Sequence, residues 1–310
     1  MTGRRAIYAQ LAVACALFGG TWPAGKVAVD HVPPLTVSTA RFALSAVLLW
    51  AWLRLRGTRV PFPGRSDLRL VAAIGFTGIA AYSVFFLVGL ERAPAADGSI
   101  IVPGLIPVAT TLLAWRVFGE RPTRAVAIGL LVAIVGLVVV VDPVGAVGSR
   151  RLVGDAILLG GPVCWAAYSV LGREAVARYG PALATTYASA AGALFLAPFS
   201  VTGWGKLVHA PLSAWAAILY LAPAATVLGF VLFYEGVRVI GAAKTASFTL
   251  LVPIFGVLSS VVILGEKLRL GLGIGGLIVL AGVWLVVRQP QAASSPTTPL
   301  NSATAAGSSE

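Results

Sequence analysis

Few residues in the long apolar stretches of this 310-residue chain could carry out chemistry. Serines occur there, at Ser99, Ser169 and Ser247, but a nucleophilic serine needs a neighbouring histidine or carboxylate to accept its proton. Both histidines, His31 and His209, lie in short polar stretches instead. The sequence therefore argues against an intramembrane hydrolase or transferase. We expect no enzyme activity, no metal site and no cofactor.

Arg41 is the charged residue that stands in the middle of an apolar run. A buried arginine is costly unless it faces protein, water or an anion, so we expect Arg41 to point away from lipid. Its fork of donors could hold a substrate carboxylate. It could equally bond the backbone carbonyls of a neighbouring broken helix.

Aromatic residues interrupt several of the same apolar runs. Tyr82 and Phe86 are four residues apart and share one face of a helix, and Trp165 lies almost one turn before Tyr168. With Trp22, they could line a cavity that suits an amino acid with an apolar side chain, although packing or interfacial belts would also explain them. The predicted substrate-binding residues are Trp22, Tyr82, Phe86, Trp165, Tyr168, Ser99 and Arg41.

The composition places these residues in a membrane protein. Hydrophobic residues make up 58% of the chain and charged residues 11%, and the mean hydropathy is +0.92, so the expected surroundings are a lipid bilayer. The net charge of +12 is spread over short loops without a binding stripe, which argues against nucleic acid. Cys15 and Cys164 fall within apolar runs, and we expect free, packed thiols.

Ten apolar runs are long enough to cross a bilayer as helices, because a span takes roughly 17 to 25 residues and lipid-exposed backbone must bond to itself. The predicted fold is therefore an all-α polytopic membrane protein. Residues 289–310 are rich in Ser, Thr, Ala and Pro and are expected to form a disordered tail. The predicted spans are 6–29, 35–53, 70–90, 99–118, 125–141, 156–172, 181–201, 212–234, 246–264 and 270–287.

The chain carries an internal repeat. A shift of 146 positions lays residues 105–141 on 251–287 without a gap, and it also lays Trp22 on Tyr168. Five spans in each copy is an odd number, so the second copy should be inverted relative to the first, as in many secondary transporters. The predicted repeats are residues 1–147 and 148–288. Two glycine pairs at a spacing of seven, in the fifth and tenth spans, predict close-packed struts without substrate contact: Gly129, Gly136, Gly275 and Gly282.

Several motifs resemble the EamA family of the drug/metabolite transporter superfamily, over about residues 6 to 288. The Gly-Glu blocks at the ends of the fourth and ninth spans are the most specific of them. The second repeat lacks the opening Gly-Thr-Trp block and has a Cys-Trp-Ala-Ala-Tyr block in its place. The resemblance implies a ten-helix carrier of the inner membrane that exports amino acids or other small metabolites, with both termini in the cytoplasm. The motifs are Leu17-Phe18-Gly19-Gly20-Thr21-Trp22-Pro23, Ala40-Arg41-Phe42, Pro107 with Gly119-Glu120-Arg121, Pro253 with Gly265-Glu266-Lys267, and Cys164-Trp165-Ala166-Ala167-Tyr168.

The resemblance and the spacing assign further roles. Because the family motif contains Arg41 whatever the substrate, its structural role is favoured. Glu120 and Glu266 are expected to be structural, each forming an interfacial ion pair with the next residue where one helix turns into another. Pro107 and Pro253 occupy matched positions and could bend their helices as alternating gates.

Lys and Arg are concentrated in the loops that share a side with the N-terminus, which predicts a cytoplasmic N-terminus, most clearly in the first repeat. All eleven acids are predicted to lie at span ends, in loops or in the tail, which favours facilitated transport over proton coupling. Glu91 or Glu235 could still titrate, so a proton-coupled exporter remains the alternative. A channel is less favoured, since no span carries a polar stripe. The expected protein is a monomeric carrier that exports small metabolites, most of all aromatic or large apolar amino acids, by alternating access.

Overall fold

A computed structural model describes residues 2–118, 123–142, 149–240, 248–249 and 251–287. Every regular element within these ranges is helical. The tail predicted for residues 289–310 lies outside the described residues. The main elements are α1 Thr2–Gly19, α2 Thr21–Val29, α3 Pro34–Leu55, α4 Leu68–Gly75, η1 Phe76–Ala81, η2 Val84–Val88, α5 Ala95–Phe118, α6 Arg124–Val141, α7 Arg150–Leu158, α8 Gly160–Tyr179, α9 Pro181–Ser200, η3 Val201–Gly203, α10 Trp204–Val208, α11 Leu212–Leu219, η4 Tyr220–Leu228, α12 Gly229–Ile240, α14 Leu251–Leu264 and α15 Leu270–Val287.

Eight helical segments in the described ranges are long and apolar enough to cross a membrane. The first runs from Arg5 to Val29 through α1 and α2, and the eighth is Leu212–Phe233. Two shorter apolar helices follow, Leu251–Leu264 and Leu270–Val286. The prediction of an all-helical membrane protein is therefore confirmed.

Two of these segments begin earlier than the sequence predicts. The predicted spans start at residues 99 and 156, whereas α5 begins at Ala95 and α7 at Arg150. Asp97 and Asp155 interrupt the apolar runs and so indicate a loop by composition, yet both are fully buried inside these helices. Asp97, in the first turn of α5, still lies at a span end as predicted, whereas Asp155 lies within α7 and departs from the prediction that the acids lie at span ends, in loops or in the tail.

The third long segment and the eighth both contain π-helical turns. These are η1 and η2 in Leu68–Val88, and η4 in Leu212–Phe233. The 146-residue shift lays η1 on residues 222–227, inside η4. The hydroxyl of Thr226 donates to the carbonyl of Leu221, five residues earlier, at 2.8 Å, and so adds a side-chain bond to the wider turn. Such turns are frequent at functional sites.

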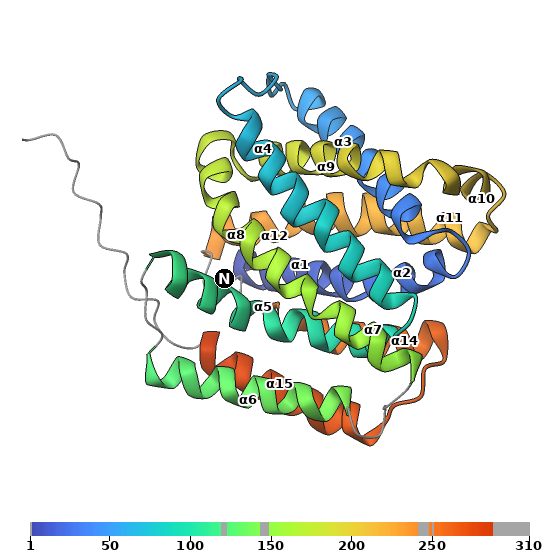
Figure 1. Ribbon diagram of the computed structural model, residues 1–310. Helices are drawn as coiled ribbons and strands as arrows, with labels where there is room; N and C mark the ends of the chain where they lie inside the picture. The colour runs from blue at the N-terminus through green and yellow to red at the C-terminus, as the bar shows by residue number, and fades with distance from the viewer. Residues whose placement is uncertain (1, 119–122, 143–148, 241–247, 250, 288–310) are drawn as a thin grey trace, which may run out of the picture.

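Helices α6 and α15 lie side by side at one edge of the bundle (Figure 1). A Cβ on Gly129 would lie 2.8 Å from the carbonyl oxygen of Gly282, and one on Gly136 would lie 2.8 Å from that of Gly275. The earlier glycine of each helix therefore meets the later glycine of the other, as in antiparallel packing. Only glycine permits this approach of the two backbones.

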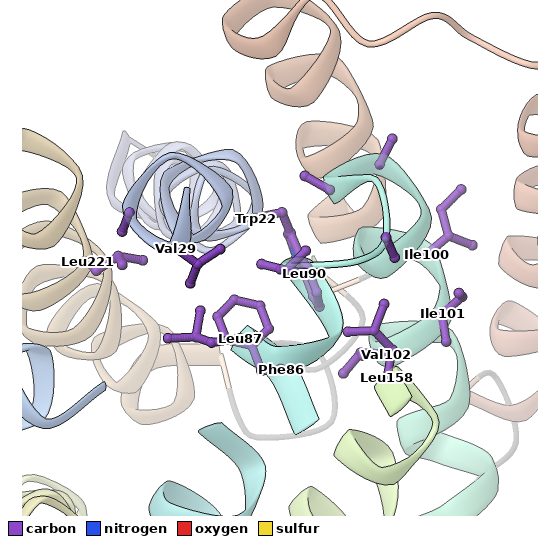
Figure 2. Close-up of a cluster of buried hydrophobic side chains, with 14 of the residues drawn as sticks. Trp22, Val29, Phe86, Leu87, Leu90, Ile100, Ile101, Val102, Leu158 and Leu221 are labelled. Carbon is purple, nitrogen blue, oxygen red and sulfur yellow. The ribbon is translucent and has the colours of Figure 1, made fainter. Parts of the chain in front are cut away.

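Helices α3, α4 and α9 pack together at the opposite edge, with α5 and α8 in contact between the two edges (Figure 1). The largest buried hydrophobic cluster joins α2, η2, α5 and α7, where Trp22, Phe86, Leu90, Ile101 and Leu158 are each at most 3% exposed. Figure 2 shows these side chains converging from the four elements. A cavity inside the bundle borders this cluster, and Trp22, Phe86 and Val102 belong to both.

Candidate functional site

Five aromatic residues form one continuous wall. Trp22 packs edge-on against Phe86, with ring centroids 4.9 Å apart, and Phe86 stacks on Tyr82 at 5.8 Å. Tyr82 contacts Trp165 at 5.4 Å, and Trp165 contacts Tyr168 at 5.6 Å. The structure therefore brings together all five aromatic residues that the sequence singles out. Each spacing lies in the range of favourable aromatic pairs.

These five residues border a cavity of about 500 Å³ inside the helix bundle. Its size is that of a small-molecule site, and most of its wall is apolar or aromatic. The wall draws on segments from both halves of the chain. Besides the aromatic wall, the lining includes Phe18, Thr21, Arg41, Phe42, Gly78, Ile79, Val102, Pro103, Ile106, Pro107, Thr110, Ser169, Thr185, Ser189, Ala225, Thr226, Phe230, Phe233, Val252, Pro253, Val279, Leu280 and Val283.

Arg41 reaches this cavity from α3. Its Nη2 donates to the hydroxyl of Thr226 in η4 at 3.4 Å, and its guanidinium lies 4.7 Å from the ring centroid of Phe42. The Nε of Arg41 is buried and has no hydrogen-bond partner among the described residues. The bond to a hydroxyl differs from the favoured prediction, in which Arg41 bonds backbone carbonyls of a broken helix. An unused donor on a cavity wall suits an anionic group of a ligand.

Several Ser and Thr residues of the cavity wall were not predicted from the sequence. Two of them matter most here: Thr226 is the hydrogen-bond partner of Arg41, and Ser189 of α9 has a buried hydroxyl without a partner in the described part of the chain. Each is a polar residue within an otherwise apolar run, which is the signal that could have found it. The signal is weak because Ser and Thr also bond their own helix backbone.

Two predictions about the lining need correction. Ser99 lies outside the cavity wall: its hydroxyl donates to the carbonyl of Ala96 at 2.8 Å, and its side chain packs against Gly256. The tenth span was expected to be a strut without substrate contact, yet Val279, Leu280 and Val283 of α15 line the cavity. Val279 contacts two neighbours at once, with one methyl group against Gly136 of α6 and the other against Gly104 of α5.

Pro107 of α5 and Pro253 of α14 both line the cavity, as their proposed gating role requires. Glu266 is placed differently from its prediction. Its two oxygens accept the backbone N–H groups of Ala95 and Ala96 at 2.8 and 2.9 Å, so it caps the start of α5 instead of pairing with Lys267. Glu120 lies outside the described residues.

The cavity thus offers aromatic faces, apolar walls and one cationic donor inside a membrane-spanning helix bundle. The model of the EamA-like transporter family matches this chain twice, over residues 6–142 and 152–288. The chain belongs to the EamA-like transporter family, and the suspected family membership is confirmed.

Individual relatives agree with this assignment. The chain is similar to the uncharacterised transporter YyaM of Bacillus subtilis, with 31% identity over 288 residues that cover 89% of this chain and 92% of that protein. It is also similar to a probable terminal-alkyne amino-acid exporter of Streptantibioticus cattleyicolor, with 30% identity covering 92% of this chain and 94% of that one. A protein of known crystal structure shares the fold, with a TM-score of 0.59 and 21% identity over 89% of this chain and 94% of that chain.

Proposed function

We propose that this protein is a secondary carrier that exports small amphipathic metabolites, above all amino acids with aromatic or large apolar side chains. The observation that carries this proposal is the cavity in which the aromatic wall and Arg41 occur together. Aromatic faces and apolar walls suit a large apolar side chain. The relative named a probable terminal-alkyne amino-acid exporter supports amino acids as the substrates.

Arg41 would bind the substrate carboxylate. Its Nε has no partner in the described ranges, and its Nη2 donates to the hydroxyl of Thr226 in the neighbouring η4 at 3.4 Å. A carboxylate would complete the donor set of the guanidinium with charge-assisted hydrogen bonds. Tyr82, Trp165 and Tyr168 would pack against the rest of the substrate.

The carrier would work by alternating access between two inverted repeats of five helices, residues 1–147 and 148–288. Two observations support this arrangement, the first for the inversion and the second for the repeat itself. The contacts of Gly129 with Gly282 and of Gly136 with Gly275 exchange with each other under the 146-residue shift, as a two-fold relation requires. The π turns in the third and eighth segments also coincide under that shift. Pro107 and Pro253 would be the matched hinges.

The surroundings would be a bacterial-type inner membrane, with both termini in the cytoplasm. The concentration of Lys and Arg in the loops on the N-terminal side supports that orientation. We propose a monomer as the working unit because a single chain lines the cavity with segments from both halves. Buried Asp97 and Asp155 remove the reason for preferring a facilitative mechanism over proton coupling.

Efflux from liposomes tests the substrate class. The purified protein would be reconstituted, the liposomes loaded with labelled phenylalanine or with phenethylamine, which lacks the carboxylate, and saturable efflux measured for each. We expect phenylalanine to leave faster, and Arg41→Gln to slow it about 10- to 100-fold, the usual worth of a hydrogen bond to a charged group. Arg41→Lys, which keeps the charge, should lose less. Equal efflux of both compounds, or no efflux of any amino acid, would contradict the assignment.

A further inference from the structure

Two aspartates are fully buried at one end of the helix bundle. Asp97 lies in the first turn of α5 and Asp155 lies in α7, and each has an exposed fraction of 0%. Arg151 of α7 and Arg269, the residue before α15, accompany them. We refer to these four side chains as the ionic cluster. The cluster does not line the cavity and plays no part in the substrate binding proposed above.

Asp97 is fully engaged in this cluster. Its Oδ2 accepts the Nε–H of Arg151 at 2.8 Å, and its Oδ1 accepts a hydrogen bond from Arg269. The Nη2 of Arg151 also donates to the carbonyls of Val140 and Val141 at 2.8 Å each, at the end of α6. Asp97 and Arg151 therefore tie the start of α5 to α6, to α7 and to the start of α15.

Asp155 is held much less well than Asp97. Neither of its oxygens accepts a hydrogen bond from any residue that the structure describes. The Nε of Arg151 is 3.5 Å from its Oδ2, while the same nitrogen bonds Asp97. A buried, ionised carboxylate without a donor is unfavourable, and two carboxylates that share one guanidinium repel each other. A proton on Asp155 would relieve both costs.

The other charged groups around the cluster have contacts of their own or face solvent. Lys26 donates to the carbonyl of Leu90 at 2.6 Å, Arg92 pairs with Glu91 at 2.9 Å, and Glu266 caps α5. Asp155 is therefore the acid here that lacks a hydrogen-bond donor within the described ranges. The charged and titratable neighbours on the bordering elements are Lys26, Glu91, Arg92, Asp142, Arg150, Glu266 and Lys267.

The cluster is joined directly to the buried layer beside the cavity. Gly98 follows Asp97, and a Cβ on Gly98 would lie 2.7 Å from the ring of Trp22 and 3.3 Å from Leu158. Leu158 comes three residues after Asp155 in α7. Trp22 and Leu158 are both buried in the layer that Figure 2 shows. Separation of α5 from α7 at the cluster would therefore also open the layer that closes this end of the cavity.

We propose that the ionic cluster is a proton-binding site, in which a proton on Asp155 holds this end of the carrier closed. In the closed state Asp155 is buried without a donor and keeps its proton. When this end opens, water solvates the carboxyl group, which ionises and releases one proton to that side. Because the closed state binds the proton more tightly, acid stabilises closure and a higher pH favours opening. The inference rests on the proposed carrier function, in which this end is one of two gates.

A reporter cysteine tests the site without any substrate. The full-length chain, with Cys15→Ser and Cys164→Ser, would carry Ala93→Cys in lipid nanodiscs, where both faces are accessible. Ala93 is 1% exposed and packs against Gly154 of α7, so a polar maleimide should reach the cysteine only when this end opens. The labelling rate would be measured against pH in this chain and in the same chain with Asp155→Asn. Their ratio cancels the titration of the thiol itself.

We expect this ratio to rise with pH, at most about tenfold per pH unit because one proton is linked to opening. Asp155→Asn is uncharged at every pH, so its labelling rate should follow the titration of the thiol alone. Asp155→Ser gives the same comparison if the asparagine variant does not fold. Glu91→Gln, at the same end of the bundle, should keep the rise. A constant ratio, no labelling at any pH, or loss of the rise in Glu91→Gln would overturn the proposal.

The two proposals fail separately. If labelling depends on pH through Asp155 but no amino acid leaves the liposomes, the substrate assignment is wrong and the proton site stands. If phenylalanine efflux is saturable but the labelling ratio is constant, the carrier assignment stands and the proton site is wrong.

Discussion

Tyr82 and Trp165 face each other across the cavity wall, with ring centroids 5.4 Å apart and planes inclined at 58°. Tyr82 directly follows the π turn η1, and Trp165 lies in α8. This pair is where the aromatic wall passes from the first half of the chain to the second. If one half of the chain moved relative to the other, the contacts of a substrate with these two rings would change.

Replacing Trp165 tests the aromatic wall. Trp165→Ala removes two ring contacts and one face available to the substrate. We expect the KM for efflux of an aromatic amino acid to rise about 2- to 10-fold, since an aromatic pair contributes about 0.5–1.5 kcal/mol beyond its buried area. The matched control is Trp115→Ala, whose ring is 47% exposed. An equal rise in both variants would contradict a binding role for Trp165.

The close approach of α6 and α15 predicts a stability difference between two glycines of α15. In Gly282→Ala the new Cβ would lie 2.4 Å from the backbone nitrogen of Ala133, and backbone cannot move aside cheaply. We expect a loss of about 1–3 kcal/mol, as for other overpacked sites. Gly273→Ala meets no atom within 4 Å and should be neutral or stabilising. Thermal unfolding in detergent measures both, and equal midpoints would contradict the packing.

Glu266 is predicted to act through α5 and not through Lys267. Glu266→Gln removes the negative charge from two hydrogen bonds at the start of α5. We expect it to lower the free energy of unfolding by about 1 kcal/mol, because a carboxylate there also complements the helix dipole. Lys267→Gln alters an exposed side chain and should change little. If Lys267→Gln lowers the thermal midpoint as much as Glu266→Gln, an ion pair between them is the better explanation.

Pro253 is predicted to set the rate of the conformational step. Pro253→Ala restores a backbone N–H in the first turn of α14 and removes the fixed φ angle that proline imposes where this helix begins. We expect kcat for efflux to fall while KM changes little. Pro198→Ala, also inside a helix but exposed and outside the cavity wall, is the control. An unchanged kcat in Pro253→Ala would exclude a hinge at this position.

A second polar cluster predicts a pH-dependent contribution to stability. Tyr179 and Arg178 both donate hydrogen bonds to Asp67, just before α4. The hydrogen bond from Tyr179 is the main effect that holds the pKa of Asp67 below its ordinary value, and the positive charge of Arg178 acts in the same direction. The same hydrogen bond raises the pKa of Tyr179 to about 12. Because the folded pKa is the lower one, the contribution of Asp67 is present above the unfolded value of about 3.9 and is lost as pH falls through the folded value.

Asp67→Asn should therefore lower the thermal midpoint near neutral pH, and its difference from the unmodified protein should shrink below about pH 4. Thermal unfolding followed from about pH 7 to about pH 3 checks this. Asp30→Asn, at an exposed residue that follows α2, is the control and should show no such change. A difference that grows in acid would contradict the assigned sign.

The helical, membrane-spanning character, the family and the residues of the aromatic wall could all be predicted from the sequence. These follow from local signals, because a span needs a continuous apolar run and residues four apart share a helix face. The spacing of Tyr82 and Phe86, together with the repeat that matches Trp22 to Tyr168, was enough to select residues that the structure brings together.

The contacts between polar groups could not be predicted from the sequence, because they join residues that are far apart along the chain. Arg41 donates a hydrogen bond to Thr226, which is 185 residues away along the chain, and Asp97 accepts one from Arg269, which is 172 residues away. When spans are predicted from continuous apolar runs, each span ends at the first charged residue, and so Asp97 and Asp155 were predicted to lie just outside the spans. Whether a charge can be buried depends on partners that only folding brings near, because an ion is stable in a low-dielectric interior when distant residues supply its hydrogen bonds.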